Sequence, residues 1–422
     1  MKNILKKIKK RDILLAVIIL TFIISVITLL ILVHPESANI IPTEEEKETA
    51  KLNALEVYDE DTDASLLTIN ATSEDKSAVL VKNKATVTIR DTAITKYDGL
   101  ISNKDKANTI GLNSAVVLSY GTHTKITGSK IETSVEYSNG LFINGKNSYV
   151  ELIDTEIKTF AFASPAIVVS THAQAKITDS NITTKVKSSP AIKINNEQGK
   201  VEINKALLET NGSSSPIFEN SGTLQIKDTP STSNGSRFGI IYSGTTTIEG
   251  STLVASGANA QDEEPSGFLI IGDSKSSELT IKNSSVNINS KLPYYKTATM
   301  FNIENTKTSI KLNNTQMNYG SYKLLNAKNS EVNFILENQI GEGHITADDK
   351  SKINITLSRS SIFMGSINNE NEGAEITLKL DSNSKFVLTK DTYITKLENE
   401  DKDNSNIKFS NYKLYVNGKS IN

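Results

Sequence analysis

The chain of 422 residues contains no cysteine, no tryptophan and only four arginines. Without cysteine it forms no disulfide and has no thiolate for catalysis or metal binding, so its fold depends on packing alone. The absence also excludes a lipid anchor on an N-terminal cysteine, and it leaves the redox compartment undecided. The arginines are isolated from one another, which argues against an arginine-rich surface that reads nucleic acid.

The net charge of the whole chain is only −2, and it is unevenly placed. Residues 1–12 carry six lysines or arginines and one aspartate, so this segment has a net charge of +5 and the remainder −7. An acidic remainder without a basic face argues against nucleic acid and against anionic polymers held by bulk charge. Polysaccharides bound by specific hydrogen bonds and stacking remain compatible with this charge.

Residues 13–33 form one uncharged, apolar run. As a helix, these 21 residues extend about 31 Å, the thickness of one bilayer core. The cationic residues 1–12 would stay in the cytoplasm, which places the C-terminus outside the cell. We therefore expect a single-pass protein of the cell membrane. A cleaved signal peptide is the alternative, but Glu36 stands where a cleavage site needs a small residue.

Residues 34–63 are polar and acidic and are expected to form a stalk. Thr43 and Glu46 have the spacing of a capping box, which predicts a short helix over residues 44–57. Its apolar side chains would cover the open end of the fold that follows. A flexible charged spacer is the alternative for this segment.

A short phrase recurs from there onward. It consists of an apolar anchor, a spacer, a turn residue, a serine or threonine (Ala206 in one copy), and a second apolar residue five positions after the anchor. The second apolar position fails once in nine copies, where Ser231 follows Ile226. The turn residue is Asp, Asn or Gly in eight of nine copies, and Lys205 is the exception. Asp, Asn and Gly tolerate the left-handed backbone of a tight bend. The anchors are Ile89, Ile126, Leu152, Ile177, Ile203, Ile226, Ile248, Ile281 and Leu312.

The spacing of these anchors predicts a solenoid. From Ile126 to Ile248 they recur at a nearly constant interval, which suits three short strands with three turns, and apolar and polar residues alternate within each strand. Ser-Pro pairs at 164, 189 and 215 repeat with the same period. We predict an all-β fold over residues 64–422, a right-handed parallel β-helix of about twelve coils. A leucine-rich repeat lacks its consensus here, and a β-sandwich would show no such period.

The C-terminal region adds a resemblance to a family. Residues 380–389 read LDSNSKFVLT, and residues 392–395 and 412–418 continue the pattern with TYIT and YKLYVNG. With the coil pattern, these segments resemble the right-handed β-helix surface proteins of Gram-positive bacteria that are described as carbohydrate-binding or adhesin-like. Phe386 and Lys390 depart from the Trp and Gly expected there. The resemblance implies a surface role and brings no catalytic residues.

Two loop insertions predict a ligand site. Residues 257–266 and 291–297 are extra segments after the third strand of neighbouring coils, so they should lie on one corner. Tyrosine rings there would stack on sugars, and carboxylates would accept sugar hydroxyls. Permissive surface loops are the alternative. The predicted site residues are Asp262, Glu263, Glu264, Tyr294, Tyr295 and Lys296.

Other chemistry has weaker support. Asp154 and Asp179 lie one coil apart and could share Ca²⁺, or they could be solvated turn formers; no other cofactor is expected. Polysaccharide lyases and polygalacturonases use this fold, but the chain has no Arg-x-Lys motif and its histidines are isolated. We expect a non-catalytic protein that binds polysaccharide or surface glycan. A polysaccharide-cleaving enzyme and a structural surface rod are the alternatives.

Overall fold

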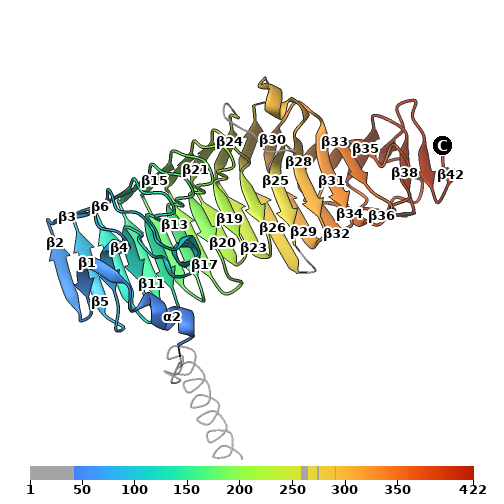
Figure 1. Ribbon diagram of the computed structural model, residues 1–422. Helices are drawn as coiled ribbons and strands as arrows, with labels where there is room; N and C mark the ends of the chain where they lie inside the picture. Colours follow the sequence, from blue (N-terminus) through green and yellow to red (C-terminus); the bar gives the residue numbers. More distant parts are fainter. Residues whose placement is uncertain (1–41, 258–264, 273–274, 290) are drawn as a thin grey trace, which may run out of the picture. The chain divides into compact units, whose positions relative to one another are not determined.

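The computed structural model describes residues 42–422 except 258–264, 273–274 and 290 (Figure 1). The chain divides into two units, Met1–Pro42 and Thr43–Asn422, and only the second is described below. The predicted transmembrane segment at residues 13–33 lies outside the described residues. Within the described ranges, no helix is long and apolar enough to cross a membrane.

Three long parallel sheets make up the unit (Figure 1). Sheet A contains β1 (Asn53–Tyr58), β4 (Lys76–Val81), β7 (Val116–Leu118), β10 (Leu141–Asn144), β13 (Ile167–Ser170), β16 (Ile192–Ile194), β19 (Phe218–Asn220), β22 (Gly239–Ile241), β25 (Ser266–Ile271), β28 (Thr299–Glu304), β31 (Lys323–Lys328), β33 (Ile340–Ala347), β35 (Ile362–Ile367), β37 (Lys385–Leu388) and β40 (Ile407–Lys408). Sheet B contains β2 (Thr62–Ser65), β5 (Thr86–Arg90), β8 (His123–Thr127), β11 (Tyr149–Ile153), β14 (Gln174–Thr178), β17 (Lys200–Asn204), β20 (Thr223–Lys227), β23 (Gly244–Glu249), β26 (Ser276–Lys282), β29 (Lys307–Asn313), β32 (Glu331–Glu337), β34 (Lys352–Ser358), β36 (Glu375–Leu380) and β39 (Lys396–Asn399).

Sheet C is shorter than the other two. It contains β3 (Thr68–Ala71), β6 (Ala93–Lys96), β9 (Lys130–Thr133), β12 (Glu156–Thr159), β15 (Asn181–Thr184), β18 (Leu207–Thr210), β21 (Pro230–Ser233), β24 (Thr252–Ala255), β27 (Ser285–Ile288) and β30 (Gln316–Asn318). A small sheet D follows, with β38 (Thr392–Ile394), β41 (Leu414–Val416) and β42 (Lys419–Ser420). The helices are α2 (Glu44–Thr49), α3 (Lys104–Ile110) and the 3-10 helix η1 (Pro293–Thr297).

The prediction of an all-β parallel solenoid is confirmed, but the number of coils is wrong. The chain winds through about 14 turns rather than twelve. The final coils are shorter than most earlier ones because they have no sheet C strand, yet Val332 still pairs with Ile353, and Ile353 with Ile376. Residues beyond 329 therefore keep winding where the recurring phrase has ended.

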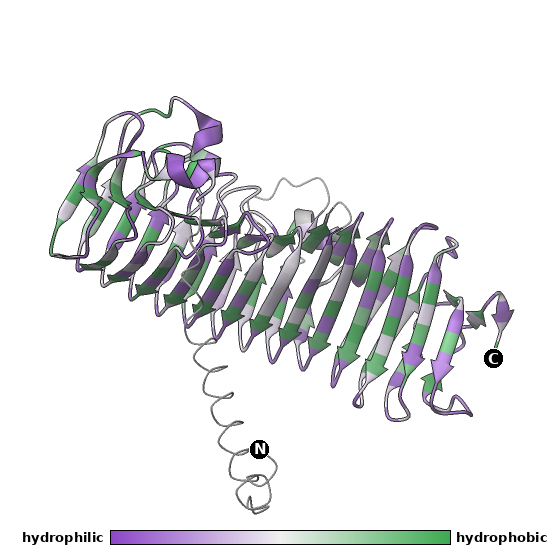
Figure 2. Ribbon diagram, turned by 90° about the horizontal axis from the view of Figure 1, so that it is seen from below, coloured by the Kyte–Doolittle hydropathy of each residue, from purple (hydrophilic) through white to green (hydrophobic). Residues whose placement is uncertain are grey.

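The core is a continuous stack of aligned apolar side chains. Ile126, Leu152, Ile177 and Ile203 pair in register on adjacent strands of sheet B, and all are buried. Figure 2 shows the alternation of apolar and polar residues along the strands that produces this arrangement. Each buried aliphatic side chain contributes about 1.5–3 kcal/mol. One coil cannot offset its backbone entropy with so few side chains, so stability depends on neighbouring coils.

The recurring phrase forms the corner between sheets B and C. Its turn residues have left-handed backbones, with φ of 47° at Asp154, 48° at Asp179 and 53° even at Lys205. The serine or threonine that follows is buried and connects coils. In six of the nine copies its hydroxyl accepts a hydrogen bond from a backbone N–H of the preceding coil, as Ser129 does from Thr92 (3.1 Å). The same hydroxyl donates to the carbonyl two residues earlier, so both groups are satisfied.

The N-terminal helix differs from its prediction in length and position. Thr43 and Glu46 do form the capping box, but α2 ends at Thr49 and the solenoid already begins with β1, ahead of residue 64. Glu46 Oε1 accepts a hydrogen bond from the Lys146 N–H at 2.7 Å, so α2 contacts the fourth coil and not the open end. The acidic residues of the first coil concealed its strands in the sequence.

Replacing Ser251 by alanine tests the hydrogen bonds that join neighbouring coils at this corner, which we call the corner ladder. Its hydroxyl accepts from the Thr229 N–H (3.1 Å) and donates to the Glu249 carbonyl (2.9 Å). The variant leaves a buried N–H without a partner, so unfolding in urea should lose about 1–3 kcal/mol. Because solenoids can unfold in parts, hydrogen exchange at the Thr229 amide should also accelerate. The exposed neighbour Thr252→Ala is the control, and an equal loss there would contradict the ladder.

Candidate functional site

A groove of about 560 Å³ lies on the outer face of sheet A, where it crosses β28, β31 and β33. We call it the sheet A groove. Pro265, just before β25, and Thr297, the last residue of η1, line it together with residues of the loops after β35 and β37. The groove therefore lies between the outer face of the solenoid and the loops beside it, and loops held by a rigid scaffold commonly carry binding residues.

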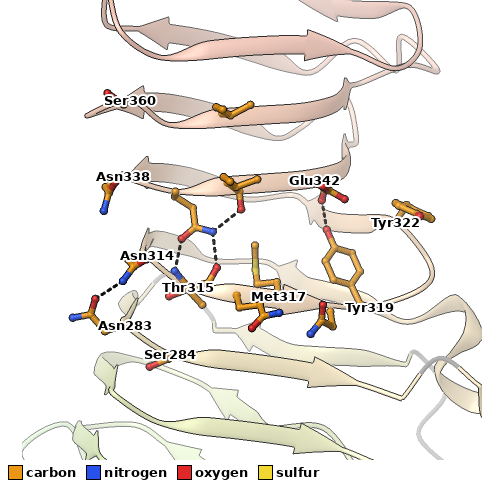
Figure 3. Close-up of a pocket in the computed structure, with 15 residues that line it drawn as sticks. Asn283, Ser284, Asn314, Thr315, Met317, Tyr319, Tyr322, Asn338, Glu342 and Ser360 are labelled. Carbon is orange, nitrogen blue, oxygen red and sulfur yellow. Dashed lines mark hydrogen bonds between the residues drawn. The ribbon is translucent and has the colours of Figure 1, made fainter.

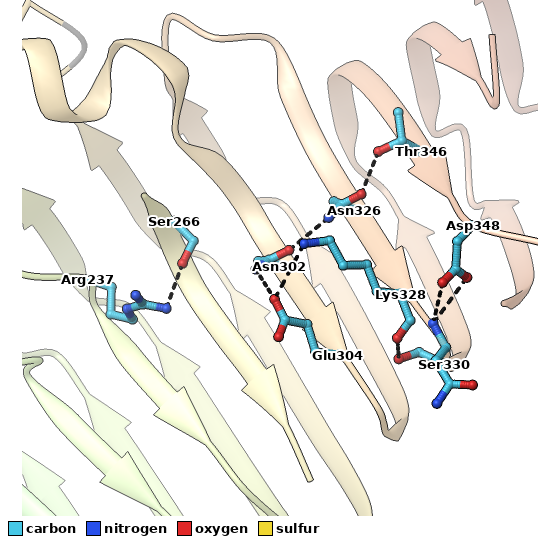
Figure 4. A network of polar contacts seen from close by, with 10 residues as sticks. Arg237, Ser266, Asn302, Glu304, Asn326, Lys328, Ser330, Thr346 and Asp348 are labelled. Atoms are coloured by element: carbon cyan, nitrogen blue, oxygen red, sulfur yellow. Dashed lines mark hydrogen bonds and ion pairs between the residues drawn. The ribbon is translucent and has the colours of Figure 1, made fainter. Parts of the chain in front are cut away.

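The floor of the groove is a ladder of uncharged polar side chains (Figure 4). Asn302, Asn326 and Thr346 occupy aligned positions on three adjacent strands. Asn326 Nδ2 donates to Asn302 Oδ1 at 3.0 Å, and Thr346 Oγ1 donates to Asn326 Oδ1 at 3.0 Å. Because these side chains hold one another, the partly exposed groups of Asn326 and Thr346 have fixed directions and lie about 4.8 Å apart along the rod, with buried Asn302 behind them.

Charged groups surround this floor. Asn302 Nδ2 donates to Glu304 Oε1 at 2.8 Å, and the same carboxylate oxygen lies 3.9 Å from Lys328 Nζ. Lys323 and Lys390 are exposed, and among the described residues neither forms an ion pair. Glu370 and Glu372 come from the single loop that follows β35. Two unpaired ammonium groups thus face solvent at a local site of an otherwise acidic chain.

His344 projects from β33 into the groove. Its Nδ1 lies 2.8 Å from Ser366 Oγ. Burial, and then the nearby charge of Lys390, lowers the pKa of His344 below its usual value, so the ring is neutral at neutral pH. Ser366 is fully buried, so its hydroxyl is not available as a nucleophile. The sequence showed only that the histidines are isolated from one another; His344 is half-buried and lines the groove.

The structure describes some of the predicted site residues and not others. Asp262, Glu263 and Glu264 lie outside the described residues, and so does the side chain of Tyr294. Lys296 is exposed on η1 but does not line the groove. Instead, the loop residues beside the predicted ones, Pro265 and Thr297, reach it.

The expectation that Tyr295 stacks on a sugar is wrong. Its side chain is completely buried, and its hydroxyl donates to the Ser236 carbonyl two coils away. The ring fills the space beside Gly257, where a Cβ would clash with it. Tyr295 therefore fastens η1 to the solenoid, and the periodicity could not distinguish such an anchor from an exposed ring.

The aspartates considered for calcium have a structural role. Asp154 and Asp179 both adopt the left-handed conformation of the corner. Among the residues the structure describes, no cluster of three or more His, Asp or Glu side chains could hold a metal ion.

The sequence analysis missed the groove's floor, although a signal was present. Asn302, Asn326 and Thr346 are each separated by one coil step in the register of sheet A. Polar residues recurring at outward positions would have revealed them.

Comparisons with known proteins found no match. No family model matches the chain, and no curated protein or solved structure matches it either.

The titration of His344 tests the electrostatics of the groove. Its midpoint, followed by NMR of ¹³C-labelled histidine in the full chain and assigned with His344→Gln, should lie below 6.5. In Lys390→Gln the midpoint should rise, because a positive charge that disfavours imidazolium has been removed, yet stay below 6.5 because burial persists. Lys385→Gln, a neighbouring lysine, should leave it unchanged. An identical midpoint in Lys390→Gln would contradict the assignment.

Proposed function

We propose that this chain is a membrane-anchored, right-handed β-helix protein of the cell surface that binds glycan in the sheet A groove without cleaving it. The observation that carries the proposal is the ladder of Asn302, Asn326 and Thr346 on the groove floor, joined by hydrogen bonds of 3.0 Å. The anchor and the outward orientation rest on residues 1–33 of the sequence.

The ladder suits a polymer of sugars. Hydroxyl groups donate and accept, so they pair with amides and with threonine hydroxyls alike. Each such hydrogen bond contributes about 0.5–1.5 kcal/mol, so useful affinity requires several in a row. A floor that extends over three adjacent coils supplies them along the rod axis, at a spacing close to the length of one sugar unit.

The lysines add a preference for acidic sugars. Lys323 and Lys390 are exposed beside the floor and are available to a carboxylate or another anionic substituent. The acidic character of the whole chain argues against capture by bulk charge, but a local pair of ammonium groups acts at contact distance, where screening is weakest. We therefore favour an acidic glycan as the ligand.

Two features favour binding over cleavage. Hydrolysis of a glycosidic bond needs two carboxyl groups on opposite sides of that bond. Among the described residues, Glu370 and Glu372 line the groove and belong to one loop, while the nearby Glu304 carboxylate is already bound by Asn302 and Lys328. The hydroxyl beside His344 belongs to buried Ser366, which no substrate reaches.

A glycan array probed with the full chain tests the proposal. Acidic polysaccharides should be retained, and Lys323→Gln/Lys390→Gln should weaken their binding about tenfold, equivalent to about 1.4 kcal/mol. Neutral glycans should be affected less, because they use the ladder alone. Asn326→Ala, which interrupts the ladder in its centre, should weaken binding of both classes.

Lys205→Gln/Lys227→Gln is the matched control. These two lysines are also exposed and lie on adjacent coils, and they are distant in sequence from the residues that line the groove. An equal loss of binding in the control would show that bulk charge, not the groove, holds the glycan. Appearance of new reducing ends or unsaturated products during incubation would favour the enzymatic alternative instead.

A further inference from the structure

The last strand of sheet C opens a second cleft. Sheets A and B continue past this point, whereas no described strand pairs with the outer edge of β30. A cleft of about 780 Å³ lies along this edge, and we call it the sheet C ledge (Figure 3). Ile340 and Glu342 of β33 line it, while His344 and Thr346 of the same strand line the sheet A groove.

The edge of β30 is closed at both ends by side chains of the chain itself. At one end, the Gln339 amide replaces the missing strand: its Oε1 accepts from the Thr315 N–H and its Nε2 donates to the Thr315 carbonyl, both at 2.7 Å. At the other end, the Tyr319 hydroxyl donates to the Glu342 carbonyl (Figure 3). Burial raises the pKa of Tyr319, so this hydroxyl stays protonated.

Between these two ends, the N–H and C=O of one residue of β30, Met317, remain uncovered by the described residues. The Gln316 N–H donates to the Ser284 carbonyl at 2.9 Å, so it points toward β27. Successive residues of a parallel strand point their N–H and C=O groups to alternate sides. The N–H and C=O of Met317 therefore point into the ledge, where no strand of the described chain meets them. This opening is too short for a strand, but it leaves one N–H donor and one C=O acceptor for a carbonyl and a hydroxyl of a small ligand.

The surroundings of Met317 match the rest of an amide-bearing sugar. Ile340 is 61% exposed, and with Ile362 and the Met317 side chain it offers an apolar patch for a methyl group. Tyr322 is 58% exposed on the rim and offers an aromatic face to a sugar ring. Asn314, held by Asn283 at 2.9 Å, supplies amide groups for hydroxyls.

We propose that the sheet C ledge binds the N-acetyl group of an amino sugar. The acetamide C=O accepts from the Met317 N–H, a neighbouring sugar hydroxyl donates to the Met317 C=O, and the acetamide methyl packs on Ile340. The inference rests on the proposed function, glycan binding, and specifies its ligand. Because outward residues of β33 from Ile340 to Thr346 line both clefts, a span of about 20 Å, one chain with N-acetyl and acidic groups can occupy both.

The test compares three tetrasaccharides by isothermal titration with the full chain: N-acetylglucosamine, glucosamine and glucose oligomers. The N-acetylated oligomer should bind at least tenfold more tightly than the other two, and the amide resonance of Met317 should shift only with it. Ile340→Lys and Tyr322→Asn should each weaken binding at least tenfold. Asn is chosen at position 322 because it tolerates the left-handed backbone that Tyr322 adopts. Leu207→Lys, an exposed leucine on sheet C, is the matched control and should bind as the parent does.

Equal binding of the glucose oligomer, or an unmoved Met317 resonance, would overturn the proposal. Preferential binding of an extended peptide with the sequence of residues 250–257 would also overturn it, since the edge would then accept a strand. So would a dimer that Ile340→Lys dissociates. The proposed function has its own criterion. If Lys323→Gln/Lys390→Gln weakens the binding of acidic glycans, glycan binding in the sheet A groove is supported even where the proposal for the ledge fails.

Discussion

The hydrogen bond that joins one coil to the next at the corner governs this structure. A left-handed residue turns the chain out of sheet B, and the hydroxyl that follows accepts an N–H from the coil before it. Without that acceptor, each turn would bury an unpaired donor at a cost comparable to the gain from one buried side chain. With it, the coils share one register, and the aligned core of Ile126, Leu152 and Ile177 follows from that register.

Both clefts arise where the repetition stops. As long as three sheets continue, every backbone edge is covered by the next coil. Once sheet C ends at β30, the strand edge is left uncovered, and β33 extends from one cleft to the other. A regular solenoid therefore supplies rigidity, and its interruption supplies the concave surface that a ligand needs.

The sequence revealed the regular part and concealed the interruptions, for physical reasons. The recurring phrase is local, so its left-handed turn could be read from residue types alone, and even Lys205 adopts the turn. The floor of the groove is not local: Asn302 and Asn326 meet only because the register of sheet A aligns them across a full coil. Tyr295 illustrates the opposite error, since a tyrosine in a polar loop reads as exposed, although contacts with Ser236 and Gly257 bury it. The first coil was missed because acidic residues interrupt its apolar alternation.

The distribution of charge also follows from the demands of a rod. A solenoid exposes strand edges at its ends, and charged side chains discourage another chain from pairing there. The first coil carries Glu56, Asp59, Glu60, Asp61 and Asp63 around its open edge, whereas Gln316, Met317 and Asn318 at the edge of β30 are uncharged. Protection at that edge comes from side chains instead, because Gln339 and Tyr319 close all but one rung. An edge blocked this far no longer pairs with strands, and the N–H and C=O of Met317 remain as the one donor and one acceptor that the proposed sugar site uses.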